Sequence, residues 1–241
     1  MPPEPLAIVT GAGHRIGKAF AETLARNGYA VLLHHWTSEA EATATRSELA
    51  GLGADVFLCR ADLTQEQGVA DLFAAADKYS RPLKVLVNSA AILRAGDPGE
   101  LSAQEWDETL DLNLRAPFLC AREAASRMKQ GGLIVNVTDV AARKNWSRFP
   151  AYSVSKAGLE ALTGILARAF APAIRVNAIA PGLTLKSNVV TDAEWQRLVD
   201  RLPLKRVAAV DEIASALEFL LKNEYVTGQT LVVDGGYSLL G

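Results

Sequence analysis

The sequence LAIVTGAGHRIG at residues 6–17 joins a short apolar run to a glycine-rich turn. The apolar run, residues 6–10, has the length of a buried strand and stops at a glycine. Gly11 permits the tight turn that follows, and Gly17 lets the next segment pack closely as a helix. That helix is expected to end near Gly28, because glycine is a common helix stop. The stretch therefore predicts a strand, a turn and a helix in direct succession.

The same alternation continues along the chain. Each predicted strand is apolar on both sides, as parallel strands covered by helices must be. The pattern predicts a single doubly wound α/β Rossmann domain over residues 1–241, with a mainly parallel seven-stranded sheet and helices on both faces. Ser38 is the expected N-cap of the second helix. Further strands are expected at residues 30–34, 54–59, 83–87, 133–138, 174–179 and 230–233, and further helices at residues 38–52, 65–79, 103–129, 151–170 and 211–222.

Residues 183–210 break this alternation. They contain polar stretches, Pro203 and a short helical pattern near residues 192–201. In doubly wound folds the ligand lies beyond the carboxyl ends of the strands, and this insertion is placed to cover that edge. We therefore expect residues 183–210 to form a lid over the substrate.

The composition is that of an ordinary globular protein, with 49% hydrophobic and 22% charged residues among 241. A net charge of −2 gives no indication of a nucleic-acid or anionic-membrane partner. The N-terminal residues lack the features of a signal peptide, and no apolar run approaches the roughly 18 residues of a membrane span. The expected location is cytoplasmic, with Cys59 and Cys120 as reduced, buried thiols.

All three histidines, His14, His34 and His35, lie near the N-terminus. They have no Cys or Glu at metal-ligand spacing, so no metal is expected. Because no histidine follows them, a Ser-His-Asp hydrolase would have to draw its base from this group, which the sequence does not favour.

The first turn and the end of the second strand together indicate a nucleotide site. A glycine-rich turn between a strand and a helix points backbone N–H groups at a pyrophosphate, although such a turn can also stand unoccupied. Enzymes that use NAD place an acid after the second strand, whereas here residues 34–38 read HHWTS and the first acid is Glu39. Arg15 supplies a positive charge, unless it is simply a solvated surface residue. The pattern favours NADP(H).

The stretch IVNVTDVAARKNWSRFPAYSVSK at residues 134–156 carries the expected chemistry. A strand ends at Asp139, and a helix opens with Tyr152 and Lys156, which lie four residues apart and so on one helix face. A phenol beside an ammonium is a proton donor with a lowered pKa, suited to the reduction of a carbonyl or imine. Asp139 could instead be a turn residue that caps nearby N–H groups.

These motifs together resemble the short-chain dehydrogenase/reductase family. The resemblance rests on Thr10-Gly11-x-x-x-Arg15-x-Gly17, Asn88, Asn113, Tyr152-x-x-x-Lys156, Pro181-Gly182 and the ending from Val226 to Gly236, and it covers essentially the whole chain.

Two departures from that family narrow the resemblance. Arg15 stands where the family usually has glycine, and Asp139 stands where it usually has a catalytic serine. Both departures resemble the pteridine reductase and dihydromonapterin reductase branch. That branch tends to carry an aromatic residue where this chain has Leu93. Trp146 and Phe149 could replace that aromatic partner, or they could pack as core.

The resemblance implies roles for named residues. Asp139, Tyr152, Lys156 and Asn113 would be catalytic, with Asn113 orienting a water relay from Lys156. Substrate would contact Arg15, Leu93, Asp139 and Tyr152. The cofactor NADP(H) would contact Gly11, His14, Arg15, Ile16, Gly17, His35, Trp36, Thr37, Ser38, Asp62, Leu63, Asn88, Ala90, Tyr152, Lys156, Pro181, Gly182 and Leu183.

Relatives in this family commonly assemble as homotetramers through the two long helices that carry Asn113 and Tyr152. A homo-oligomer is therefore expected by resemblance. Apolar residues on these segments fit either an interface or the core, and one sequence does not divide them. They are Leu112, Phe118, Leu159, Leu162 and Leu166.

The sequence thus predicts an NADPH-dependent reductase of a C=N or C=O bond, with a small dihydropterin-type substrate. The alternative is an alcohol dehydrogenase or ketoreductase that acts on another small carbonyl compound. A catalytically inactive NADP-binding sensor is a third reading, which the intact set of Asn113, Tyr152 and Lys156 disfavours.

Overall fold

The computed structural model describes residues 4–144 and 146–240, so the ends of the predicted domain lie outside the described residues. The described residues form a seven-stranded sheet in the order β3-β2-β1-β4-β5-β6-β7, and every pairing is parallel. The strands are β1 (Leu6–Val9), β2 (Ala30–His35), β3 (Val56–Arg60), β4 (Leu83–Asn88), β5 (Gly132–Val137), β6 (Ile174–Pro181) and β7 (Thr230–Val233).

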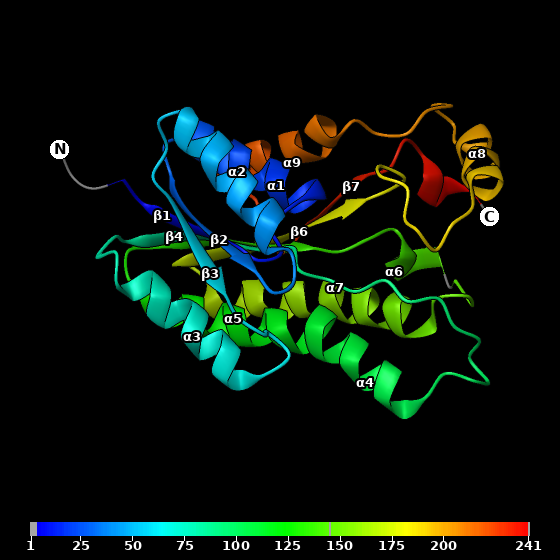
Figure 1. The fold of residues 1–241 in the computed structure, drawn as a ribbon, viewed down its shortest axis with the longest axis horizontal. Helices are drawn as coiled ribbons and strands as arrows, with labels where there is room; N and C mark the ends of the chain where they lie inside the picture. Colours follow the sequence, from blue (N-terminus) through cyan, green and yellow to red (C-terminus); the bar gives the residue numbers. More distant parts are fainter. Residues whose placement is uncertain (1–3, 145, 241) are drawn as a thin grey trace.

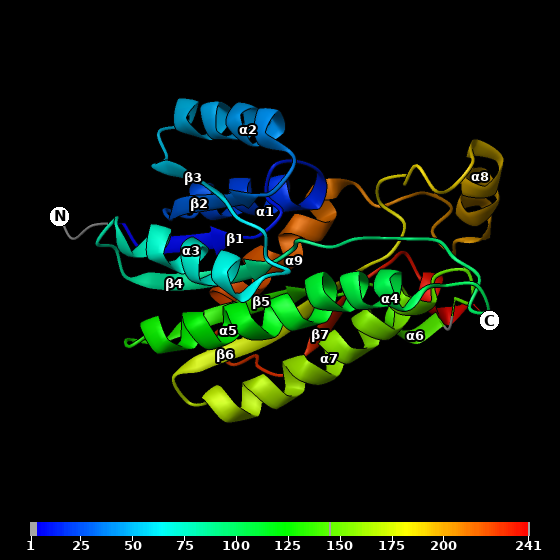
Figure 2. The ribbon, with the colours of Figure 1, turned by 60° about the horizontal axis from the view of Figure 1, so that its bottom comes forward.

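Helices cover both faces of the sheet, as Figures 1 and 2 show. One layer holds α1 (Arg15–Arg26), α2 (Glu39–Gly51) and α9 (Val210–Lys222). The other holds α3 (Glu66–Asp77), α4 (Ala103–Leu110), α5 (Ala116–Arg127) and α7 (Pro150–Phe170). Two further helices, α6 (Ala141–Lys144) and α8 (Asp192–Arg201), lie beyond the carboxyl ends of the strands.

Each layer buries its own apolar cluster against the sheet. Phe20 and Leu24 of α1 pack with one face, and Leu72 and Phe73 of α3 pack with the other; all four are fully buried. Burying one such side chain contributes about 1.5–3 kcal/mol to folding. Because both faces of the sheet are covered, its strands are mainly apolar, as the sequence predicted, with buried polar exceptions such as His34 and Asn88 near their carboxyl ends.

The cysteines and the long helices resolve further predictions. Cys59 and Cys120 are buried free thiols, as expected. Leu159 and Leu166 are core residues, Leu112 and Leu162 pack partly buried against that core, and Phe118 is 42% exposed.

The predicted helix at residues 103–129 is interrupted by a π-helix, Asp111–Arg115, between α4 and α5. The prediction of Ser38 as the N-cap residue of α2 is confirmed, although its side chain does not form the cap. Ser38 occupies the N-cap of α2, but its side chain makes no capping hydrogen bond with any described residue. Its carbonyl oxygen accepts from Ala42 N instead.

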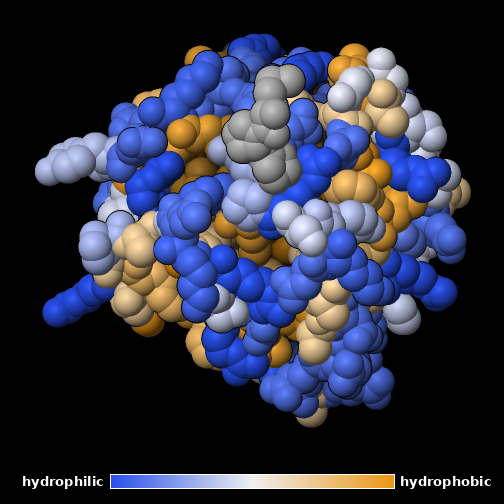
Figure 3. Space-filling model, turned by 90° about the vertical axis from the view of Figure 1, so that its left-hand side faces the viewer, coloured by the Kyte–Doolittle hydropathy of each residue, from blue (hydrophilic) through white to orange (hydrophobic). Residues whose placement is uncertain are grey.

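The amino-terminal edge of the sheet carries a mostly hydrophilic surface, with apolar side chains in small separate patches (Figure 3). The two ends of the sheet therefore differ, since the other end opens into the cavity described below. Across the described ranges, no helix combines the length and apolarity that a membrane crossing requires.

Candidate active site

The sheet order changes direction between β1 and β4, which are neighbours although three helices and two strands separate them in sequence. At such a switch point the chain leaves the two strands in opposite directions and opens a crevice at their carboxyl ends. A cavity of about 1340 Å³ lies there. That volume exceeds the 300–1,000 Å³ typical of one small ligand, so it can hold a substrate together with part of a cofactor.

The glycine-rich turn forms one wall of this cavity. Gly11 has a φ of 64°, and a Cβ at this position would lie 2.8 Å from Ala90 Cα. A Cβ on Gly17 would lie 2.2 Å from Gly11 O, so only glycine lets α1 begin here. Thr10 Oγ1 accepts from Ser89 N and Ala90 N, which fastens the turn to the end of β4.

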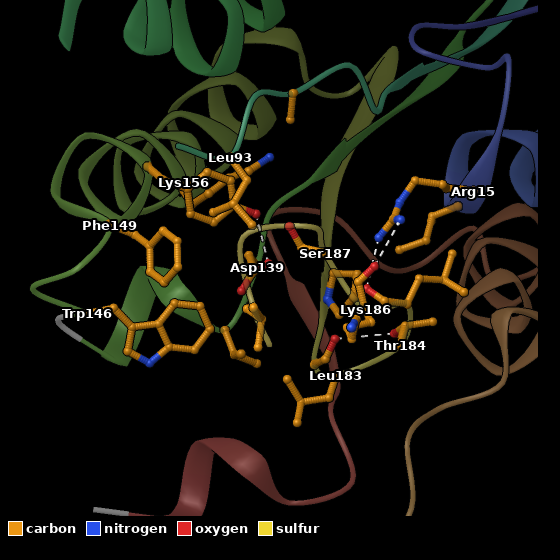
Figure 4. Close-up of a pocket in the computed structure, with 18 of the residues that line it drawn as sticks. Arg15, Leu93, Asp139, Trp146, Phe149, Lys156, Leu183, Thr184, Lys186 and Ser187 are labelled. Atoms are coloured by element: carbon orange, nitrogen blue, oxygen red, sulfur yellow. Dashed lines mark hydrogen bonds between the residues drawn. The ribbon is translucent and has the colours of Figure 1, made fainter. Parts of the chain in front are cut away.

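Arg15 takes a left-handed φ of 58° at the start of α1, a conformation that favours glycine. Its guanidinium donates to Leu185 O at 2.9 Å and to Lys186 O at 3.4 Å (Figure 4). The glycine-rich turn is therefore joined directly to residues 183–210. A left-handed non-glycine residue costs about 1–2 kcal/mol, so Arg15 holds this place at some expense of stability.

The buried side chain of His34 holds the glycine-rich turn in place. Its Nδ1 accepts from Gly11 N at 3.2 Å, and its Nε2 lies 2.9 Å from Ala61 O, so the neutral tautomer with a proton on Nε2 satisfies both contacts. Burial lowers the pKa of His34 to about 4, which keeps the ring neutral. His35 is also buried, and its Nδ1 has no hydrogen-bond partner among the described residues.

Asp139, Tyr152 and Lys156 meet at the carboxyl end of β5. The Tyr152 hydroxyl donates to Asp139 Oδ2 at 2.8 Å, while Asp139 Oδ1 accepts from Ala141 N at 2.8 Å. Lys156 Nζ donates to Val137 O at 2.7 Å and lies 5.7 Å from the centre of the Tyr152 ring. Asp139 therefore contacts the tyrosine and caps the start of α6 at the same time.

The predicted lowering of the Tyr152 pKa is wrong. Burial and the neighbouring Asp139 raise the pKa of Tyr152 well above its ordinary value. Burial likewise raises the pKa of Asp139, and it lowers the pKa of Lys156 to about 8. Burial and the Asp139 carboxyl group affect the Tyr152 pKa more strongly than the Lys156 ammonium does, because the Nζ of Lys156 is directed to the main-chain oxygen of Val137. At neutral pH the site therefore holds a protonated phenol.

Asn113 lies fully buried in the π-helix, a distortion that is frequent at functional sites. Its side chain accepts from Ile92 N at 2.8 Å and donates to Ile92 O and Ser155 Oγ. Within the described residues no hydrogen bond joins Asn113 directly to Lys156. A relay between them would need a water molecule, as the resemblance implies.

The cavity brings together most of the predicted residues. Its lining includes Gly11, His14, Arg15, Ile16, Gly17, Ala90, Leu93, Asp139, Tyr152, Lys156, Pro181, Gly182 and Leu183. Other predicted residues lie beside the turn at the ends of β2 and β3, outside this lining: His35, Trp36, Thr37, Ser38, Asp62 and Leu63. The Asn88 amide points elsewhere and donates to Asn136 Oδ1 at 2.9 Å, across β4 and β5.

Trp146 and Phe149 line the cavity, with ring centres 6.0 Å apart (Figure 4). Trp146 also packs against Tyr237, which lines the cavity from the far end of the chain. Trp146 thus packs in a small apolar cluster and also faces the cavity.

Sequence reasoning missed Arg60, at the end of β3. Its guanidinium lies 4.9 Å from the Trp36 ring centre, and its Nε donates to Trp36 O at 3.3 Å. Parallel pairing sets Arg60 opposite His35, next to the end of β2 where the cofactor is selected. Its position, two residues before Asp62 at a strand end, was the only signal in the sequence.

Known proteins are similar to this chain over nearly its whole length. The family model described as enoyl-(acyl carrier protein) reductase matches residues 11–238. The 3-oxoacyl-(acyl-carrier-protein) reductase FabG of Staphylococcus epidermidis is 32% identical over 237 residues, covering 95% of this chain and 97% of its own length. The chain belongs to the short-chain dehydrogenase/reductase family. This confirms the resemblance and the prediction of an oxidoreductase.

Two solved structures of this reductase family are similar over almost the whole chain. FolM alternative dihydrofolate reductase 1 from Brucella suis, in complex with NADP, has a TM-score of 0.93 and 34% identity over 100% of this chain and 98% of its own. The blue fluorescent protein from a metagenomic library, in complex with NADPH, has a TM-score of 0.91 and 32% identity, with 97% of each chain covered. The prediction of NADP(H) agrees with both.

Proposed function

We propose that this chain is an NADPH-dependent reductase of a C=N or C=O bond in a dihydropterin-type substrate. The observation that carries the proposal is the Asp139–Tyr152 hydrogen bond of 2.8 Å, which faces a cavity bordered on its other side by Arg15. A carboxyl group in place of the family's usual serine gives the site an acid pair, suited to a substrate that must be protonated on nitrogen.

The turn around Gly11 fits a dinucleotide. Any side chain at Gly11 or Gly17 would collide with the backbone, so the main-chain N–H groups at the start of α1 stay open to an anion. NADPH, when bound, would supply the hydride, with Gly11, His14, Ile16 and the residues beside Ala90 along its length. His34 holds the turn in place from the buried side.

The charges beside this turn favour the 2′-phosphate of NADP(H). The end of β2 has no acid before Glu39, so nothing there repels a phosphate. Arg60, stacked on Trp36, places a guanidinium at the end of β2. Thr37 and Ser38 follow Trp36 in the chain, and their hydroxyls can donate hydrogen bonds. Arg15 adds a second positive charge on the cavity side.

Tyr152 donates the proton. The raised pKa keeps its phenol protonated at neutral pH, and its hydroxyl lies at the cavity wall. The reaction adds hydride to the carbon of the double bond and the Tyr152 proton to its nitrogen or oxygen. Lys156, on the same helix face, then stabilises the phenolate. Asp139, whose pKa is raised by burial, returns a proton to Tyr152 along their hydrogen bond.

A flat, polar ring suits the substrate side of the cavity. Trp146, Phe149 and Leu93 lie around Asp139, and the two aromatic side chains offer ring faces to the cavity (Figure 4). Arg15 and Asp139 can bond the donor and acceptor groups of a 2-amino-4-oxo ring. Residues 183–210 would close over such a ring, since Arg15 already binds their main chain.

A homotetramer is part of the proposal. Phe118 on α5 and Val154 and Ile165 on α7 are large exposed apolar residues, 42%, 48% and 64% accessible. Light scattering of the purified chain tests this, and a monomer would exclude it.

The alternative function is reduction of a 3-oxoacyl group or another ketone, which the similarity to FabG favours. Steady-state rates with NADPH separate the two, using a panel of dihydropterins, quinones and β-ketoesters. The proposal predicts that kcat/KM for a dihydropterin exceeds that for any ketoester by at least about tenfold. A clear preference for a ketoester would overturn it.

A further inference from the structure

Basic residues outnumber acidic residues in the cavity lining, and two of them, Lys186 and Arg148, are paired with Asp192 and Glu194. Two acids border the cavity, Asp139 and Glu194. The cations that border it are Arg15, Arg148, Lys156, Lys186, Arg197 and Arg201.

Both acids are already engaged. Asp139 accepts from Tyr152 and from Ala141 N. Glu194 caps the start of α8 through Thr191 and pairs with Arg148 at 3.1 Å. Neither is therefore free to neutralise a further cation.

Arg197 and Arg201 form a separate pair on α8. In the described part of the chain, neither reaches a carboxylate within salt-bridge distance, and the Nε of Arg197 donates only to Ala193 O of its own helix. The two residues lie one helical turn apart, where like charges repel. Arg201 gains from the helix dipole at the carboxyl end of α8, but Arg197, in the middle, does not.

The face of α8 that carries these arginines is held toward the cavity. Leu198 and Leu202 pack with Val140 and Tyr237 in a small apolar cluster. Val140 directly follows Asp139, so this cluster ties α8 to the loop that bears the proposed acid. Arg197, Leu198 and Arg201 border the same cavity as Tyr152. The helix is thus anchored by its leucines, with the arginines beside them.

We infer that Arg197 and Arg201 form a subsite for an anionic side chain of the substrate, a carboxylate or a phosphate ester attached to the ring. This rests on the proposed function, since the ring would lie between Asp139 and the aromatic wall with its side chain running toward α8. Guanidinium groups bind both anions with paired N–H bonds. The substrate is then a charged dihydropterin, preferred over one with a neutral side chain.

The test compares the double variant R197Q/R201Q with the matched control K205Q. Glutamine removes the positive charge and has a helix propensity close to that of arginine. Lys205 follows α8 and donates to Asp200 O, outside the cavity lining. Substrates are dihydrofolate, which ends in carboxylates, a dihydropterin phosphate ester, and dihydrobiopterin, whose side chain is neutral.

For the wild-type chain we expect kcat/KM to be about tenfold or more higher with an anionic substrate than with the neutral one, and this preference to shrink as salt rises. R197Q/R201Q should reduce the preference to about twofold or less, mainly through KM, while K205Q retains it. The two anionic substrates distinguish carboxylate from phosphate. Equal KM values for charged and neutral dihydropterins in the wild type, or a preference unaffected by R197Q/R201Q, would overturn the subsite. Absence of turnover with every dihydropterin would instead refute the proposed function.

Discussion

Asp139→Asn removes the acid from the proposed proton path while it keeps the shape of the side chain. In the protein as it stands, Oδ1 of Asp139 accepts from Ala141 N and Oδ2 accepts from the Tyr152 hydroxyl, both at 2.8 Å. An asparagine can keep the first contact through its amide oxygen, but it presents an N–H group to Tyr152 in place of an acceptor. The substitution therefore isolates the bond between residues 139 and 152.

The size of the effect follows from that bond. A hydrogen bond between neutral groups contributes about 0.5–1.5 kcal/mol, which corresponds to a drop of roughly 2- to 13-fold in the rate of the chemical step. The dependence of the rate on pH provides a second test of the role of Asp139. Because burial raises the pKa of Asp139, its protonated form is available toward lower pH, and the wild-type rate should rise as pH falls through that pKa. In D139N this rise should disappear.

The assay follows the loss of NADPH absorbance with a dihydropterin at saturating cofactor. It runs from about pH 5 to 9, around the pH range in which folded proteins are usually most stable. D77N, the same change at an exposed carboxylate of α3 that pairs with Arg127, is the control. Thermal unfolding of each variant checks that the fold is intact. A folded D139N with kcat within twofold of wild type and an unaltered pH profile would refute the role given to Asp139.

Three further predictions follow from single residues. His34 is neutral because burial lowers its pKa to about 4, so protonating it in acid should destabilise the fold. Its protonation should lower the free energy of unfolding by about 3 kcal/mol between pH 7 and pH 4. In urea titrations, H34Q should lose less free energy of unfolding over that range. R60Q should weaken NADPH binding about fivefold by fluorescence titration and leave NADH affinity within error, and an equal loss for both would remove Arg60 from phosphate selection. R15G should relieve a left-handed arginine, worth about 1–2 kcal/mol, against about 0.4–1 kcal/mol of added chain entropy, so the free energy of unfolding should rise by about 0.5–1 kcal/mol while KM for the dihydropterin increases; a less stable R15G would contradict the strain.

Local patterns in the sequence were sufficient for the fold. Gly11 and Gly17 mark the tight turn after β1, where any larger residue would collide with the backbone. Apolar strands that alternate with helices leave few topologies open. The π-helix at Asp111–Arg115 could not be foreseen in the same way. Over five residues, its side-chain spacing differs too little from that of an α-helix to change the apolar pattern.

The site was predictable where it depends on neighbours in sequence and less so where it depends on neighbours in space. Tyr152 and Lys156 share a helix turn, so their common face could be read directly. The predicted direction of the Tyr152 pKa shift was wrong because that shift depends on burial and on Asp139, 13 residues earlier. The sequence does not quantify either effect. Arg60 was missed because its partner Trp36 lies 24 residues away, brought close only by the pairing of β2 with β3.

The measurement that tests the central claim most directly is a crystal structure of the chain with NADP and a dihydropterin bound. The account predicts that the pterin ring lies flat over the nicotinamide, with Asp139 and Arg15 in hydrogen-bond contact with its edges and the Tyr152 hydroxyl next to the atom that receives the proton. A ring bound elsewhere, or one that touches neither Asp139 nor Arg15, would contradict the assignment of this reductase to dihydropterins.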